Sequence, residues 1–180
     1  MSAVTAAAPR RCLVIGSGGA GKTTFARLLA DRTGLPVVHL DALYWSSGWQ
    51  PKPGEEWRDV VDELVRRPRW IMDGNYGGTL DARLAAADTV YFLDTPRWIC
   101  LTRVLRRWWR YRGLSRPSMP DGCPERITWG FLAWIWSYPR RRRPGILARL
   151  AEFEGVRVRV LRTARERGDA LREFEAGGDG

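Results

Sequence analysis

The chain has 180 residues and a formal net charge of +10. This length suits one domain with a sizeable core, and no stretch of the sequence approaches the roughly 18 uncharged apolar residues of a membrane span. The three cysteines, Cys12, Cys100 and Cys123, lie far apart, so they predict neither a disulfide framework nor a metal site and favour a reducing cytoplasm.

The positive charge is concentrated in the second half of the chain. Thirteen arginines lie between Arg97 and Arg149, against only Asp121 and Glu125. Such a block can bind nucleic acid, an acidic membrane surface or the phosphates of a small substrate. Composition alone leaves these three partners open.

Short apolar runs alternate with helical patterns between residues 11 and 175, which predicts an α/β fold with a parallel sheet covered by helices. Residues 1–10 and 176–180 are expected to be disordered tails. The last strand alternates valines with arginines, as an edge strand with one solvated face does. The predicted strands are 11–15, 37–40, 70–73, 90–93 and 156–161. The predicted helices are 22–32, 54–66, 80–86, 97–112, 128–138, 145–153 and 164–175.

A complete phosphate-binding P-loop follows the first strand and opens the first helix. Its glycines let backbone N–H groups approach a polyphosphate, and the helix start adds its positive dipole end. Lys22 is expected to reach the β- and γ-phosphates and the Thr23 hydroxyl to hold Mg²⁺, so the chain is predicted to bind Mg-ATP. The predicted nucleotide-binding residues here are Gly16, Ser17, Gly18, Gly19, Ala20, Gly21, Lys22, Thr23 and Thr24.

Acidic residues end three of the predicted strands. Asp73 is the expected metal-side acid, with Asp94 as its alternative, although either can be a helix cap or turn residue. Asp41 is expected to act as a general base toward an acceptor hydroxyl or, alternatively, to cap the next segment. His39, the only histidine, is expected to be buried and hydrogen-bonded.

The helix predicted over 97–112 carries a row of arginines on one face. Arg103, Arg107 and Arg110 suit a triphosphate, the alternative being a solvated surface. One arginine of the run 140–143 is expected to reach the transferring phosphoryl group, with Arg143 as the candidate. The predicted catalytic residues are Lys22, Asp41, Arg107 and Arg143. The predicted buried face of this helix comprises Trp98, Leu101, Val104, Leu105 and Trp108.

The segment that follows this helix is rich in proline and glycine, and we predict a lid over about 113–127. Arg116 and Arg126 in the lid are weaker candidates for the phosphoryl group. On the opposite side of the site, Trp45 and Trp49 are expected to line an acceptor pocket.

These motifs together resemble those of the nucleoside-monophosphate-kinase-like P-loop proteins. More narrowly, the chain is similar to the adenylate-kinase-related family often labelled DNA topology modulation proteins. The resemblance implies a three-layer P-loop NTPase fold with a five-stranded parallel sheet in the order 2-3-1-4-5 and a lid. By this likeness Arg103 would pack on the adenine of ATP, Arg107 would contact its phosphates, and Asp73 would be the metal-side acid. The matching stretches are 16–24, 39–49, 70–76, 87–97, 122–125 and 131–138.

The sequence departs from adenylate kinases on the acceptor side. The arginine that grips the acceptor phosphate shortly after the metal-side Asp-Gly is missing, and the next arginine is Arg83. Asp41 stands where an arginine is usual, and its carboxylate would repel a monophosphate dianion. The sequence therefore favours a small-molecule kinase whose acceptor is a hydroxyl compound or a nucleoside. The predicted acceptor-binding residues are Asp41, Trp45, Asn75, Tyr76 and Arg83.

Two other functions stay open at this point. The first is a nucleoside-monophosphate kinase in which Arg83 replaces the missing phosphate clamp. The second is a nucleotide-regulated DNA-binding protein that uses the arginine-rich surface, although no DNA-reading motif is visible. A membrane partner is not expected, and the sequence leaves the oligomeric state undetermined.

Overall fold

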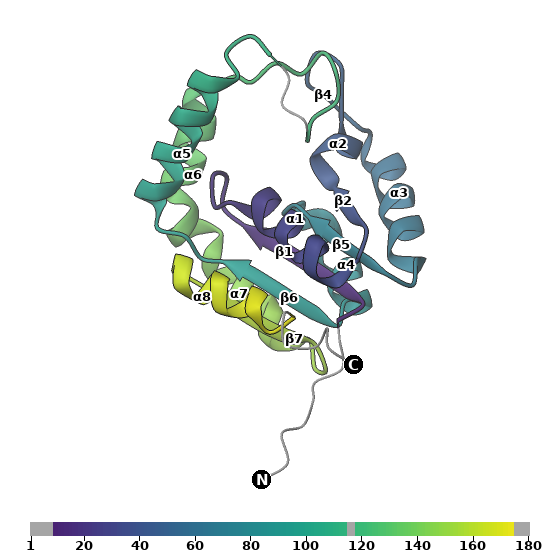
Figure 1. Ribbon diagram of the computed structural model, residues 1–180. Helices are drawn as coiled ribbons and strands as arrows, with labels where there is room; N and C mark the ends of the chain where they lie inside the picture. The colour runs from purple at the N-terminus through teal and green to yellow at the C-terminus, as the bar shows by residue number, and fades with distance from the viewer. Residues whose placement is uncertain (1–8, 115–117, 175–180) are drawn as a thin grey trace.

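The computed structural model describes residues 9–114 and 118–174. Five parallel strands form its central sheet in the order β2-β5-β1-β6-β7 (Figure 1). Counted as the predicted strands, this order is 2-3-1-4-5, so the implied strand order is confirmed. Because β1 lies in the middle, the loop that follows it opens at the centre of the carboxyl edge. The strands are β1 (Arg11–Gly16), β2 (Val37–His39), β5 (Trp70–Asp73), β6 (Thr89–Leu93) and β7 (Arg157–Leu161).

Helices cover both faces of this sheet, which confirms the predicted fold class. Successive residues of β1 point to opposite faces, so Cys12 and Val14 join a core with α1 and α8, whereas Leu13 and Ile15 join one with α3, α4 and α7. Burial on both faces explains the uninterrupted apolar sequence of β1. The helices are α1 (Lys22–Thr33), α2 (Leu40–Tyr44), α3 (Gly54–Arg66), α4 (Leu80–Ala86), α5 (Arg97–Arg110), α6 (Trp129–Arg141), α7 (Arg143–Glu152) and α8 (Ala164–Arg172), and a 3-10 turn, η1, spans Gly77–Thr79.

Two elements after β2 were not predicted. The strand ends at His39 rather than at Leu40, which is the buried first residue of α2. A small antiparallel hairpin of β3 (Trp45–Ser46) and β4 (Gln50–Pro51) follows directly. A five-residue helix and two-residue strands are too short to show a hydrophobic period, so the sequence pattern could not reveal them.

The α6–α7 junction also differs from the prediction. α6 continues beyond Pro139 to Arg141, and α7 begins at Arg143. The arginine run 140–143 therefore spans the end of one helix and the start of the next.

The buried face of α5 is only partly the predicted one. Val104 is fully buried together with Cys100, but Trp98 and Leu105 are exposed. Apolar residues occupy two stripes of this helix, and their spacing alone does not say which stripe faces the core. The prediction for Trp98 and Leu105 was wrong for this reason.

Residues 1–8 and 176–180 of the predicted tails, residue 175 at the end of the last predicted helix, and lid residues 115–117, which include Arg116, lie outside the described residues. Arg10 is tied to the sheet, because its amide donates to Asp88 and its carbonyl accepts from the Trp70 amide. No helix in the described parts of the chain has the length and apolar composition needed to cross a membrane.

Candidate active site

The P-loop joins β1 to α1. Gly16 has a φ of 148°, and a Cβ atom there would lie 2.6 Å from the Leu93 carbonyl oxygen, so a side chain would push the loop away from β6. Lys22 lies over the loop, where its Nζ donates to the carbonyls of Gly16 (3.0 Å) and Ser17 (3.1 Å). Thr24 is exposed, and the first turn of α1 has neither an acidic residue nor a side-chain cap that would compete with an anion at the helix start.

Thr23 and Asp73 meet beside the P-loop. Thr23 Oγ1 donates to Asp73 Oδ2 at 2.7 Å, and His39 Nδ1 lies 3.1 Å from the same oxygen. Strand pairing causes this contact, because it places Asp73 between β1 and β2. A hydroxyl and a carboxylate in contact fit an Mg²⁺ ion that takes its other ligands from phosphates and water. The described residues contain no cluster of three or more His, Cys, Asp or Glu that could hold a metal alone.

Asp94, the alternative metal-side acid, is paired with arginines at the end of β6. Arg143 Nε lies 2.9 and 3.0 Å from its two carboxylate oxygens, and Arg162 Nε lies 3.3 Å from Oδ2. The hydrogen bond to Asp94 raises the pKa of Arg143. This geometry favours Asp73 for the metal and holds Arg143 in an ion pair, which does not support its predicted catalytic role.

Two arginines converge on the nucleotide side of the P-loop. Arg103 Nη1 donates to the Ala20 carbonyl at 3.2 Å, and Arg167 of α8 donates to Thr95, which itself donates to Ala20. Burial, followed by the charge of Arg103, lowers the pKa of Arg167. The Arg167 Nε is buried without a hydrogen-bond partner among the described residues. Nothing in the sequence around Arg167 indicated this position.

Arg107 lies further along α5 and pairs with the lid. Its Nε and Nη2 lie 2.8 and 2.7 Å from the Oε1 of Glu125, which is buried. This ion pair attaches the end of the lid to α5, and the phosphate contact of Arg107 stays a prediction.

On the acceptor side, Tyr76 donates to Asp41, with 2.6 Å between its hydroxyl oxygen and Oδ1. Burial first, and then the charge of Asp41, raise the pKa of Tyr76, so its hydroxyl keeps its proton. The Tyr76 ring packs against Tyr44 (4.7 Å between centroids) and Trp57 (5.0 Å), which fixes the hydroxyl toward Asp41.

Asn75 and Arg83 hold the backbone instead of facing a ligand with their polar groups. Asn75 accepts from the Gly16 amide at 2.9 Å and donates to its carbonyl at 2.7 Å, which fastens the loop after β5 to the P-loop. Arg83 is fully buried, and its guanidinium donates to the carbonyls of Thr79, Gly74, Asn75 and Tyr76. Burial lowers the pKa of Arg83 to about 10. The structure therefore does not support Arg83 as an acceptor clamp.

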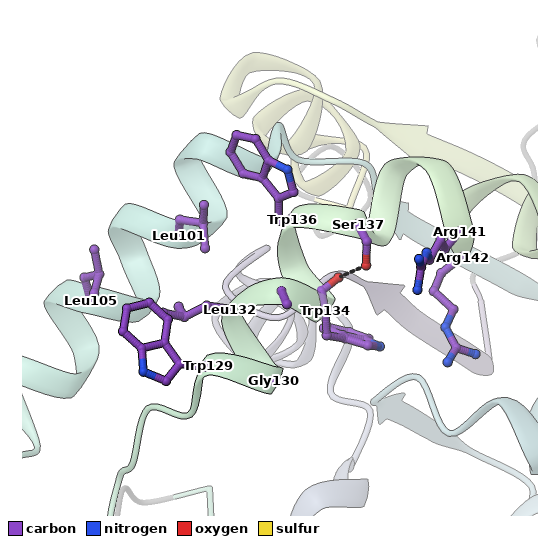
Figure 2. Close-up of a pocket in the computed structure, with 11 residues that line it drawn as sticks. Leu101, Leu105, Trp129, Gly130, Leu132, Trp134, Trp136, Ser137, Arg141 and Arg142 are labelled. Carbon is purple, nitrogen blue, oxygen red and sulfur yellow. Dashed lines mark hydrogen bonds between the residues drawn. The ribbon is translucent and has the colours of Figure 1, made fainter.

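A cavity of about 620 Å³ lies between the loop after β5 and the α6–α7 junction. Asn75, Tyr76, Gly77 and Gly78 line one side. Of the arginine run, Arg141 and Arg142 line the other side, and Figure 2 shows both at the end of α6. Arg149 of α7 completes the wall. These three cations, and not Arg143, are the arginines that face the candidate acceptor space.

The β3–β4 hairpin meets the lid across the open edge of the sheet (Figure 1). Trp45 packs edge-on against Trp49 (5.4 Å between centroids), which has a positive φ of 61°. The lid contacts are Gly48 N to Gly122 O (2.9 Å), Trp49 Nε1 to Pro124 O (3.0 Å), Cys123 Sγ to Ser46 O (3.1 Å) and Arg126 over the Trp49 ring (4.8 Å). Trp49, predicted to line the acceptor pocket, instead joins the hairpin to the lid.

No family model matches the chain. A protein of Thermococcus onnurineus (strain NA1) named "Putative adenylate kinase" is 30% identical over 118 residues. The match covers 64% of this chain and 62% of that protein, so the chain spans less than two thirds of the relative's length.

Solved kinases resemble more than nine tenths of the chain in structure. A shikimate kinase from Acinetobacter baumannii, in complex with shikimate, has a TM-score of 0.59 at 19% identity and covers 92% of this chain and 90% of its own. A gluconokinase from Sinorhizobium meliloti 1021 has a TM-score of 0.56 at 20% identity, and the match covers 94% of this chain and 91% of the gluconokinase. The chain has the P-loop kinase fold. At these identities the likeness does not transfer an acceptor to this chain.

Proposed function

We propose that this chain is an ATP-dependent kinase that transfers the γ-phosphoryl group of Mg-ATP to a hydroxyl of a small acceptor, a hydroxyl compound or a nucleoside. The observation that carries the proposal is the Asp41–Tyr76 pair at the carboxyl edge of the sheet. A carboxylate can accept a hydroxyl proton but repels a monophosphate dianion. Arg83, the first arginine after Asp73 in the sequence, is bound to backbone carbonyls of the loop after β5 and so is not placed to grip an acceptor phosphate.

The nucleotide side supplies the groups for the donor. The P-loop backbone and Lys22 would bind the β- and γ-phosphates, and Arg103 and Arg167 lie beside the same loop. Thr23 and Asp73 would hold Mg²⁺, which neutralises charge on the phosphates when bound.

In the proposed step, the acceptor oxygen forms a bond to the γ-phosphorus while the bond from that phosphorus to the bridging oxygen of ADP breaks. Asp41 takes the hydroxyl proton, and the electron pair of the broken bond stays on the β-phosphate of ADP. Tyr76 orients the Asp41 carboxylate through its hydrogen bond. Arg141 or Arg142 would stabilise the negative charge of the transferring group.

A nucleoside-monophosphate kinase is the second candidate, and a specific observation favours it. Arg141, Arg142 and Arg149 line the cavity, so cations for an acceptor phosphate can come from α6 and α7 instead of the loop after β5. The relative named as an adenylate kinase points the same way. In this reaction the nucleophile is an ionised phosphate oxygen, and Asp41 has no proton to accept.

The experiment that tests the proposal is mass spectrometry of the protein with Mg-ATP and a pool of nucleosides, nucleoside monophosphates, sugar acids and shikimate. A new phosphorylated alcohol that disappears with Lys22→Ala supports the hydroxyl kinase. New nucleoside diphosphates from monophosphates support the second candidate and overturn the first. Formation of neither product, with Mg-ATP binding demonstrated by calorimetry, means that no acceptor class in the pool fits the site.

A further inference from the structure

The face of α5 that points away from the P-loop is apolar and exposed. Cys100 and Val104 on the opposite face are buried, and Val104 lies in the core shared with α1. On the outer face Trp98 is 61%, Trp109 74% and Leu105 49% exposed. Charged or polar residues ordinarily occupy such a position on a surface helix, so this stripe needs an explanation.

α6 extends this apolar surface. Trp129 is 88% exposed, and the Trp136 ring lies against Trp98 at 4.5 Å between centroids. A groove of about 770 Å³ runs between the two helices, with Leu101 and Leu105 on one side and Leu132 on the other (Figure 2). We call the surface formed by Trp98, Leu105, Trp109, Trp129 and Trp136 the indole face.

The charge around the indole face has one sign. α5 and α6 together contain seven arginines and no aspartate or glutamate. Arg106, Arg110 and Arg140 are exposed. The guanidinium of Arg97 lies 3.9 Å from the centre of the Trp136 ring, so cation and indole occupy the same surface. The partner of this face must therefore present both apolar groups and negative charge.

We propose that the indole face binds the surface of an anionic lipid bilayer. Indole rings prefer the level of the lipid headgroups, where the ring is in contact with acyl chains and its N–H with water. Arginines at the same level attract anionic headgroups, each adding about 1 kcal/mol near the surface. The three most exposed tryptophans project from the helices, as insertion into a bilayer requires, and the P-loop lies on the opposite side of α5.

Two other occupants fit the observations less well. A second copy of this chain would place one arginine-bordered surface against another, and the two would repel. A single-stranded nucleic acid needs free ring faces for stacking, but Arg97 covers a face of Trp136, and leucines make up much of the groove. The proposal does not depend on the kinase reaction.

Flotation of the full chain with vesicles tests this inference. The vesicles are phosphatidylcholine alone or phosphatidylcholine with about one third phosphatidylglycerol. We expect binding to the anionic vesicles only, and weaker binding at higher salt. Trp109→Ser with Trp129→Ser should lower the affinity at least about tenfold, and Arg106→Ala with Arg140→Ala by about thirtyfold. Leu28→Ser removes an exposed apolar residue from α1 and should leave binding unchanged.

Far-UV circular dichroism of each variant shows whether the fold is retained. The inference is overturned if the unsubstituted chain fails to float with anionic vesicles, or if the double tryptophan variant floats equally well. It is also overturned if the tryptophan substitutions abolish a dimer in solution, or binding to single-stranded DNA, while vesicle binding is absent.

Discussion

Tyr76 donates a hydrogen bond to Asp41 with 2.6 Å between the oxygens, although the two residues are 35 positions apart. α2 presents Asp41 directly after β2, and the loop after β5 presents Tyr76, so neighbouring strands bring the pair together. A carboxylate that accepts a hydrogen bond from a protonated phenol at the carboxyl edge of the sheet is the arrangement from which we infer hydroxyl phosphorylation.

Lys22→Ala tests the nucleotide side. Loss of the ammonium should lower phosphoryl transfer at least about a hundredfold, because a charged donor to the transition state is removed. Lys52→Ala is the matched control, since Lys52 is the other lysine of the chain and lies beyond the hairpin. Product formation followed by mass spectrometry measures the effect. Equal loss in both variants would contradict the assignment of Lys22.

Asp41→Asn separates the two candidate reactions. A hydroxyl acceptor should lose roughly 10²- to 10⁴-fold in kcat, because the general base is removed. A monophosphate acceptor should react at nearly the original rate. Tyr76→Phe should lower kcat less, since it leaves the base in place and removes only the hydrogen bond that orients the Asp41 carboxylate. A steady-state comparison of all three proteins with both acceptor classes decides between them, and a hydroxyl reaction unaffected by Asp41→Asn would exclude Asp41 as the base.

The Tyr76 hydroxyl also predicts a pH dependence of stability. Folding raises its pKa above the value of about 10 that an unfolded tyrosine has. The stability this contributes is complete below the unfolded value and is lost as the pH rises above it. We expect the free energy of unfolding to fall more steeply above about pH 10 in the unsubstituted protein than in Tyr76→Phe. Urea titrations at several pH values measure the free energy of unfolding of both proteins. The same dependence on pH in the two proteins would contradict a buried, protonated Tyr76.

Substitution of Arg83 should lower stability, whereas substitution of Arg142 should lower turnover. Arg83→Ala leaves buried carbonyls without donors and should lower the free energy of unfolding by about 3 kcal/mol. Arg142→Ala, at an exposed position that lines the cavity, should change stability by less than about 0.5 kcal/mol and reduce turnover by about a hundredfold. Chemical denaturation and initial rates distinguish the two. An Arg83→Ala protein as stable as the unsubstituted chain would contradict the structural role of Arg83.

The contact between hairpin and lid predicts that nucleotide binding affects the acceptor side. Arg107 pairs with Glu125, and the neighbouring Arg126 lies over Trp49 in the hairpin. Mg-ADP should therefore slow amide exchange in residues 45–51 as well as in the P-loop. Trp49→Ala should retain the protection of the P-loop and lose that of the hairpin. Hydrogen exchange read by mass spectrometry tests this, and an unchanged hairpin in the unsubstituted protein would contradict it.

The local pattern of residues was enough to predict most of the strands, loops and helices of this protein. The glycines of the P-loop, the apolar runs of β1 and β6 and the acids at strand ends are short-range features, and the described structure has a strand, loop or helix where each was expected. Helices α3 and α4 begin and end at the predicted residues. In α3 an apolar period of 3.6, with Pro53 before the helix and Pro68 after it, marks the bounds.

Only the tertiary structure decided which long side chains serve the site. Arg143 meets Asp94 from 49 positions away, and Arg83 binds a loop whose path no local signal predicts. The outward position of Trp98 likewise depends on how α5 is rotated against the core. Residue spacing determines which side chains share a face, but the partner that meets that face comes from a distant part of the chain, so the sequence alone could predict the faces and not their partners.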